Sequence, residues 1–257
     1  MALLLVAAAA WEWARLNQLP GAAALATAAL CVALCAAAWG AGWLGQRLTP
    51  LWALAAVLWV AVVTLLLRRG PQGWSTLPLA WRWAGGVLAL WLTWLAVAQA
   101  RVLGINVLLS VLTLVWAADI AAYFAGRAFG LRFTRTRLAP SISPGKSWEG
   151  VWSGMFGVLL LAVVWMAFDR HAGPAVPSLY TRLFEALGGA GLVVAVIFLA
   201  ALSVVGDLFE SLVKRSAGAK DSSGLLPGHG GVLDRVDSVT AALPVLVLGL
   251  ALLEVLD

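Results

Sequence analysis

Residues 211–237 read SLVKRSAGAKDSSGLLPGHGGVLDRVD, a polar segment between two apolar runs long enough to cross a membrane. The segment holds three acids, four bases, one histidine and five glycines. Lysine and arginine neutralise phosphate groups, and carboxylates are the hard oxygen ligands that Mg²⁺ prefers beside substrate phosphates. Glycines let the backbone turn tightly and bring its N–H groups close to an anion. This loop is therefore the first candidate for a functional site.

The rest of the chain is far more apolar than a soluble domain. Of its 257 residues, 63% are hydrophobic and only 11% are charged. Because a hydrocarbon core of about 30 Å needs about 20 apolar residues in a helix, we predict one all-α, polytopic, membrane-embedded helical bundle over residues 1–257. The first ten apolar residues are too few to span and predict a short N-terminal helix. Seven full spans are predicted, at 21–44, 51–67, 84–100, 102–125, 151–168, 187–208 and 238–256.

The net charge of +5 comes from bases in the loops. Beside a bilayer, such bases indicate lipid headgroups and phosphorylated substrates as partners. No nucleic-acid-binding motif is visible, so we predict no nucleic-acid partner. Placing 211–237 on the cytoplasmic side puts 13 of the 17 lysines and arginines there, as the positive-inside rule expects. The other side then keeps Arg47, Arg101, Arg170 and Arg182.

The cysteines and several tryptophans are interpreted as structural residues, without a role in a site. Cys31 and Cys35 lie one helical turn apart in an apolar segment and are predicted as small core residues, not as a disulfide or metal pair. Several tryptophans lie near predicted helix ends, where an interfacial belt is expected. They are Trp43, Trp52, Trp81, Trp83, Trp148 and Trp152.

A second polar loop, 126–150, reads GRAFGLRFTRTRLAPSISPGKSWEG and is strongly basic. Ser143 and Lys146 lie just before a predicted helix start, and a helix N-terminus of this kind can bind an anion. The alternative is an ordinary basic loop with Ser147 as N-cap and Glu149 in the first turn. A P-loop is excluded, because no glycine stands five residues before Gly145.

Two acids, Asp119 and Asp207, fall inside predicted spans, where a charge is costly and usually functional. Asp207, Ser211 and Lys214 are spaced to share one helix face. Asp119 could instead make a structural bond between helices, for example to Arg127, and Asp207 could be an interfacial acid.

The remaining candidates in the loop also have structural alternatives. Asp234 and Asp237 could provide favourable charge at the start of the last helix, with Asp237 as its N-cap. His229 could be a hydrogen-bonding residue that stabilises the loop.

Residues 211–238 resemble the signature of the phosphatidate cytidylyltransferases, also called CDP-diacylglycerol synthases. AADIAAYFAGRAFG (117–130) and SISPGKSWEG (141–150) are also similar to segments of that family, with Ser147 where threonine is usual. Members typically have a complete first span before a segment like Trp-Glu-Trp-Ala-Arg, and this chain begins inside that span. The matching signature positions are Ser211, Lys214, Arg215, Lys220, Asp221, Ser223, Pro227, His229, Gly230, Gly231, Asp234, Arg235 and Asp237.

The resemblance implies that CTP and phosphatidate react to give CDP-diacylglycerol and pyrophosphate. It implies Mg²⁺ as cofactor, leaves a second metal ion open, and implies a homodimer in membrane lipid, in the bacterial cytoplasmic (inner) membrane. Asp207, Asp234 and Asp237 would hold metal. Lys214, Arg215, Lys220 and Arg235 would hold phosphate, with Asp221 and His229 also in the catalytic set. The implied substrate-binding residues are Asp119, Ser143, Lys146, Ser211, Ser223, Gly230 and Gly231.

Two other functions are open at this stage. A CTP-dependent enzyme of the polyprenol kinase or CDP-archaeol synthase type would use a similar loop on another lipid. An ion-coupled transporter would explain acids within spans, but it should bind its ion near the bilayer midplane, often between inverted repeats. We find no internal repeat, and the acids gather at one end of the predicted helices.

Overall fold

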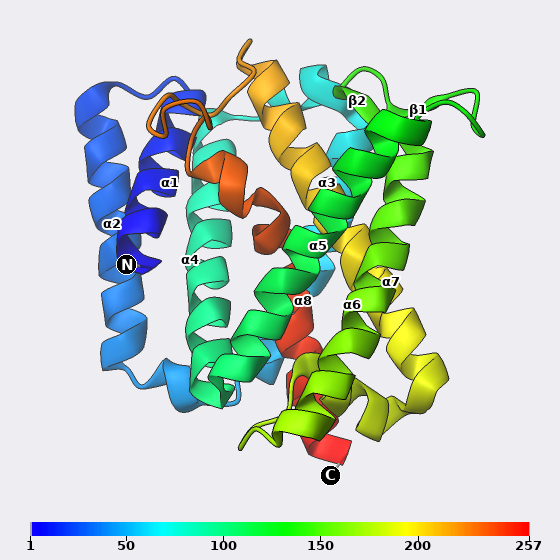
Figure 1. The fold of residues 1–257 in the computed structure, drawn as a ribbon. Helices are drawn as coiled ribbons and strands as arrows, with labels where there is room; N and C mark the ends of the chain where they lie inside the picture. Colours follow the sequence, from blue (N-terminus) through cyan, green and yellow to red (C-terminus); the bar gives the residue numbers. More distant parts are fainter. Residues whose placement is uncertain (1, 257) are drawn as a thin grey trace.

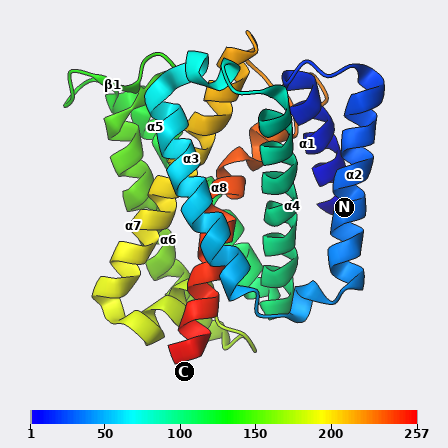
Figure 2. The same ribbon diagram turned by 180° about the vertical axis from the view of Figure 1, so that it is seen from behind.

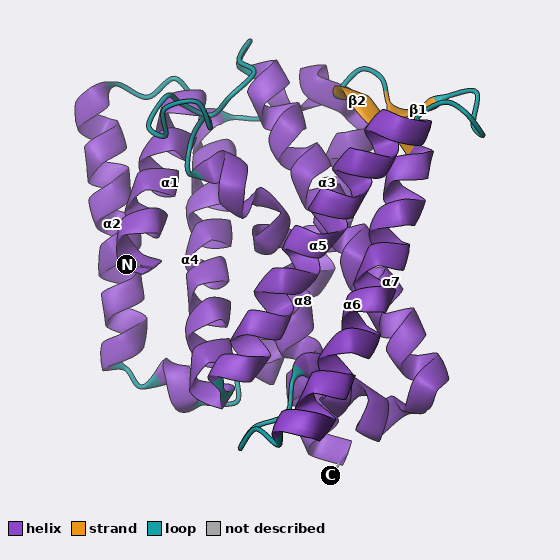
Figure 3. Cartoon of the chain, viewed as in Figure 1, coloured by secondary structure: helices purple, strands orange, loops and turns teal. Residues whose placement is uncertain are grey.

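A computed structural model of the protein describes residues 2–256, with the side chains of residues 241, 243 and 250–256 left out. This part of the chain forms a helical bundle with one small antiparallel hairpin (Figures 1 and 3). The helices are α1 (Ala2–Leu16), α2 (Gly21–Gly40), η1 (Trp43–Gly45), α3 (Thr49–Ser75), α4 (Leu79–Leu103), α5 (Ile105–Phe129), α6 (Trp148–Ala172), α7 (Leu179–Ser216) and α8 (Leu233–Leu256), and the strands are β1 (Arg137–Ala139) and β2 (Ser143–Ser147).

The predicted all-α, polytopic class is confirmed. Within the described residues, the six helices α2 to α7 are long and apolar enough to cross a membrane. The seventh predicted span, 238–256, lies in α8, and the side chains of its last seven residues are outside the described set. Helices α3 and α7 run past their predicted ends and continue across kinks at Gly70 and Gly188, where the backbone φ is 69° and 67°, whereas α2 ends at Gly40, before its predicted end.

Helix α1 starts at mid-height of the bundle and runs to the end that carries the polar loops (Figure 1). This confirms the predicted short N-terminal helix. Trp13 fixes α1 against α4, since its indole packs on Gly86, where a Cβ would lie only 1.8 Å from Trp13 Cε2. Trp13 also meets Trp74 edge to face, with ring centroids 5.6 Å apart.

Helix α8 passes through the middle of the bundle and contacts α3, α4 and α7 (Figure 2). The α1–α2, α3–α4, α5–α6 and α7–α8 connections lie together at one end (Figure 1). The two polar loops therefore meet at one end of the bundle, as their predicted topology requires.

The core confirms one structural assignment and corrects another. Cys31 and Cys35 are buried and free, as predicted. Trp52, assigned to an interfacial belt, is fully buried, and its Nε1 donates to Gln99 Oε1 at 3.0 Å. The belt prediction was wrong for Trp52 because an indole near a helix end can turn inward where a buried acceptor is available.

Candidate active site

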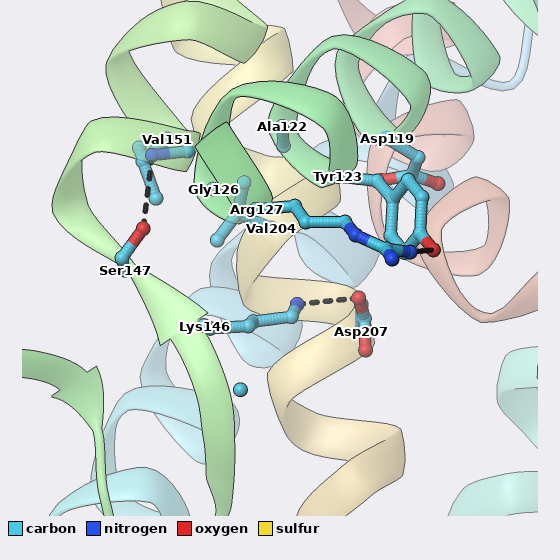
Figure 4. Close-up of a pocket in the computed structure, with 12 residues that line it drawn as sticks. Asp119, Ala122, Tyr123, Gly126, Arg127, Lys146, Ser147, Val151, Val204 and Asp207 are labelled. Atoms are coloured by element: carbon cyan, nitrogen blue, oxygen red, sulfur yellow. Dashed lines mark hydrogen bonds and ion pairs between the residues drawn. The ribbon is translucent and has the colours of Figure 1, made fainter. Parts of the chain in front are cut away.

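A cavity of about 400 Å³ opens between α5, β2, α6 and α7 at the polar end of the bundle (Figure 4). Lys146 reaches from β2 across this cavity to Asp207 on α7 and forms an ion pair with its carboxylate. Ser211 Oγ donates to the other oxygen of Asp207 at 3.3 Å, which agrees with their predicted shared helix face. The cavity is lined by Asp119, Ala122, Tyr123, Gly126, Arg127, Gly145, Lys146, Ser147, Gly150, Val151, Val204 and Asp207.

Two further acids, Asp119 and Asp237, lie near this ion pair. Asp119, Asp207 and Asp237 are within electrostatic range of one another and of Lys146. Arg127, the predicted alternative partner of Asp119, instead donates to the Tyr123 hydroxyl at 3.3 Å (Figure 4). One lysine thus lies within electrostatic range of three carboxyl groups, and Arg127 is a second cation in the lining of the cavity.

A second cluster centres on Lys214 in the last turns of α7. Lys214 Nζ lies 2.5 Å from Glu210 Oε2 and 2.6 Å from Asp234 Oδ1. Asp234 also accepts from the Ser222 N–H at 3.0 Å, the Ser222 hydroxyl at 2.9 Å and the Gly231 N–H at 2.7 Å. Burial alone would raise the pKa of Asp234, but the contacts with Glu210 and Lys214 and these backbone donors hold that pKa well below its usual range. Asp234 is therefore a fully engaged carboxylate.

Glu12 on α1 is a site residue that the sequence analysis missed. It is completely buried and accepts four hydrogen bonds from the α7–α8 loop and the start of α8. The available signal was a charged residue in an otherwise apolar helix, which usually marks a function or a specific partner.

The Gly230-Gly231 pair allows these carboxylates to approach the backbone. Gly230 has φ of 79°, and a Cβ there would lie 2.7 Å from Asp234 Oδ2. A Cβ on Gly231 would lie 2.0 Å from Ser222 Oγ and 2.5 Å from Glu12 Oε1. Both positions thus require glycine for close contact, and Gly230 also requires it for its left-handed backbone conformation.

Glu149, a buried acid in the first turn of α6, holds the segment that precedes the hairpin. Glu149 Oε1 accepts from the N–H groups of Phe133 and Thr134, at 3.0 and 2.7 Å. Ser147 caps α6 by accepting from the Gly150 N–H at 3.2 Å, so the local interpretation of Ser147 and Glu149 is confirmed. Ser143 begins β2 but does not line the cavity, whereas Lys146 does.

Several predicted residues lie at the surface of the α7–α8 loop or of the helix ends beside it. Arg215 donates to the carbonyls of Ile142 and Ala219, and so joins the two polar loops. Arg235 donates to the carbonyl of His229, whose ring Nδ1 lies 3.1 Å from the Pro227 carbonyl. Arg215, Lys220, Asp221, His229 and Arg235 are all exposed. A second cavity, of about 320 Å³, lies between this loop and the end of α1 and is lined in part by Trp11, Ser222 and Ser223.

The predicted start of the last helix was wrong. The last span was predicted to begin at residue 238, with Asp237 as its N-cap in the structural alternative. Helix α8 instead begins at Leu233, so Asp237 lies within the helix and accepts from the Ser238 N–H at 2.7 Å. Two of the three predicted metal ligands are paired with different lysines. Asp234 forms an ion pair with Lys214, and Asp207 forms one with Lys146. Among the described side chains, no three histidine, cysteine, aspartate or glutamate residues are close enough to hold one ion without other ligands.

A model of the cytidylyltransferase family matches residues 1–253 of the chain. A phosphatidate cytidylyltransferase of Pseudomonas aeruginosa is 43% identical over 247 residues, which cover 93% of this chain and 82% of that protein. A phosphatidate cytidylyltransferase of Haemophilus influenzae is 49% identical over 141 residues, covering 55% of this chain and 44% of that protein. One of Bacillus subtilis is 36% identical, covering 58% of this chain and 49% of that protein. With nearly its whole length matched, the chain belongs to the cytidylyltransferase family.

Proposed function

We propose that this chain transfers the CMP group of CTP to phosphatidate and releases pyrophosphate. The observation that carries this proposal is the meeting of two acid and base clusters at the polar end of α7, beside a cavity between membrane helices. The 43% identity to the Pseudomonas aeruginosa phosphatidate cytidylyltransferase supports the choice of substrates.

The reaction needs alignment and charge neutralisation more than proton transfer. A phosphate monoester is already anionic near neutral pH, so an oxygen of phosphatidate can attack the α-phosphorus of CTP directly. A new P–O bond forms to that phosphorus, and the bond to the bridging oxygen of the β-phosphate breaks, with its electron pair leaving on pyrophosphate. The site must hold two anions close together and stabilise the leaving group.

Lys146 is placed for the first of these tasks. Its ammonium group stands in the cavity beside Asp207, with its side chain 23% exposed, so a phosphate that enters the cavity meets it. Lys214 is less available, since its side chain is 13% exposed and already pairs with Glu210 and Asp234. We therefore assign phosphate binding in the cavity to Lys146 and assign Lys214 to fixing the position of Asp234.

We also propose that Mg²⁺ acts at this site. Mg²⁺ is usually held by one or two carboxylates together with substrate phosphates. Asp207, with Asp119 and Asp237 in electrostatic range, could supply one or two of these carboxylates, although the three are not close enough together to hold an ion by themselves. When bound, Mg²⁺ would neutralise phosphate oxygens. Asp234 fits less well, because Lys214, Ser222 and Gly231 already occupy its oxygens.

The cavity also fits a substrate whose tails stay in lipid. Tyr123, at the cavity edge, is 61% exposed on the side of the bundle, and Val151 and Val204 add apolar surface. Acyl chains could therefore leave sideways between helices while the phosphate stays near Lys146. We propose that this end faces the cytoplasm of a bacterial inner membrane, where CTP is available. We further propose a homodimer, which the mass of the detergent-solubilised protein would test.

The function can be tested with CTP labelled separately at its α and γ phosphates. Purified protein is incubated in detergent with Mg²⁺ and phosphatidate, and the lipid fraction is counted. We expect the α label in lipid and the γ label in pyrophosphate. The γ label in lipid would instead indicate a lipid kinase, and no transfer of either label would contradict the proposal.

A further inference from the structure

Glu12 connects the N-terminal helix to the α7–α8 loop, which lies more than 200 residues away in the sequence. Its Oε1 accepts from the Ser223 hydroxyl at 2.5 Å and from the Val232 N–H at 2.9 Å. Its Oε2 accepts from the Ser222 hydroxyl at 3.1 Å and from the Leu233 N–H at 2.6 Å. A completely buried carboxylate is costly unless it is compensated, and here the Ser223 hydroxyl and two backbone N–H groups provide that compensation together with the Ser222 hydroxyl, which is shared with Asp234.

Two of these four donors are the backbone N–H groups at the start of α8. The first amides of a helix have no partner within the helix, and a carboxylate stabilises them by hydrogen bonding and by charge. Glu12 thus caps α8 from another helix. This explains why α8 begins at Leu233, before the apolar run from which a start near residue 238 was predicted.

The cap acts on the residues assigned to the site. Asp234 follows Leu233 directly, and the Ser222 hydroxyl lies 3.1 Å from Glu12 and 2.9 Å from Asp234. A hydroxyl has one proton to donate, so Ser222 serves one of the two carboxylates at a time and ties their positions together. One helical turn beyond, Asp237 lies within electrostatic range of Asp119 and Asp207, which line the cavity.

We propose that Glu12 is a positioning residue for the cytidylyl transfer, and that by capping α8 and holding Ser222 and Ser223 it sets where Asp234 and Asp237 stand relative to the cavity. This inference rests on the proposed function. The neighbouring Trp13 supports it, because contact with Gly86 and Trp74 gives α1 a fixed position from which Glu12 can act. Glu12 itself does not line the first cavity, so it acts through the loop and not by touching a substrate there.

The decisive variant is Glu12→Gln, which keeps the shape but turns one acceptor oxygen into an NH₂ donor facing N–H and O–H donors. We expect kcat to fall about 100-fold, as a displacement of about 1 Å can cause, while KM for CTP changes less than about threefold. Amide hydrogen exchange should become faster at residues 232–237 and remain as in the wild type in α5 and α6. Glu185→Gln, the same change at an exposed position of α7, should alter neither kcat nor the amide exchange of residues 232–237.

Ser223→Ala keeps the Glu12 charge and removes one donor, so it tests the same contact if Glu12→Gln folds poorly. We expect a kcat loss of about tenfold, in line with one hydrogen bond to a charged group, and no further loss when Ser223→Ala is added to Glu12→Gln. Unchanged kcat in Glu12→Gln, or exchange that rises equally in all helices, would overturn the proposal. Should the wild type transfer no label, the proposed function fails, and the exchange pattern at 232–237 still decides whether Glu12 holds α8.

Discussion

Asp207 and Asp234 lie in the same polar region, and their surroundings differ. Asp234 is bound by Lys214, by two groups of Ser222 and by the Gly231 amide, and its side chain is 10% exposed. Asp207 has Lys146 and Ser211 as partners, lines the cavity and is 29% exposed. Two further acids, Asp119 and Asp237, stand near Asp207 and share the positive charge of Lys146.

Asp207 and Asp234 were both predicted to bind metal, but their surroundings favour two different roles. A carboxylate whose oxygens are all engaged by protein donors fixes the loop, and its removal leaves those donors unpaired. A carboxylate that faces a cavity among like charges can take up a cation together with a phosphate ligand. We therefore propose a structural role for Asp234 and substrate or metal binding for Asp207, and each proposed role has a different experimental signature.

The largest effect on turnover is expected for Asp207→Asn. Loss of this charge should reduce kcat about 1,000-fold, the upper range for removing one group that stabilises a transition state. The apparent melting temperature in detergent should change little, because Asp207 is partly exposed and has few partners. Label transfer and thermal unfolding, measured on the same preparation, check the expected loss of kcat and the expected constant melting temperature. Turnover near that of the wild type would remove Asp207 from the site.

Asp234→Asn should affect both activity and stability. Breaking a buried ion pair on one side costs about 3 kcal/mol, so we expect the melting temperature to fall by about 5–10 °C and kcat by about 100-fold. Asp207→Asn is its matched control, since the same chemical change is made in a more open setting. If Asp234→Asn lost activity with an unchanged melting temperature, Asp234 would act like the acids near the cavity, and its proposed structural role would be wrong.

Much of this arrangement could be predicted from the sequence. The apolar runs predict the spanning helices because each run alone satisfies the length that a bilayer requires. Ser211 lies near Asp207 because spacing on a helix fixes which side chains share a face. These are local properties, and the structure agrees with them.

The parts that could not be predicted depend on distant contacts. The cap at the start of α8 comes from Glu12, more than 200 residues earlier, so no local pattern shows it. Lys214 is predicted to hold phosphate, but its close contact with Asp234, which lies 20 residues further along the chain, did not follow from the sequence. Trp52 turned inward because Gln99 on α4 offers an acceptor. In each case a tertiary partner decides the outcome, and residue type alone does not reveal the partner.

Gly231→Ala tests how tightly the loop is held. An added Cβ would collide with Ser222 and Glu12, so the loop must shift, and we expect kcat to fall about 30-fold, less than the full effect of a displacement near 1 Å. Gly224→Ala is the matched control, because a Cβ there meets nothing within 4 Å. Steady-state kinetics of both variants check the expectation. Equal rates for the two would mean that the loop adapts easily and that close packing around Glu12 is unimportant.

The smallest effect is expected for Arg235→Lys. In the structure Arg235 is exposed in the first turn of α8 and donates to the His229 carbonyl in the preceding loop. Lysine keeps the charge and can make one such bond but not two parallel bonds to a phosphate. If Arg235 only supports the loop, kcat/KM for CTP should fall less than about tenfold, the value of one ordinary hydrogen bond. A much larger loss, confined to kcat/KM with the melting temperature unchanged, would show that the guanidinium grips a phosphate directly, and the surface of the α7–α8 loop would then be a third functional region beside Asp207 and Asp234.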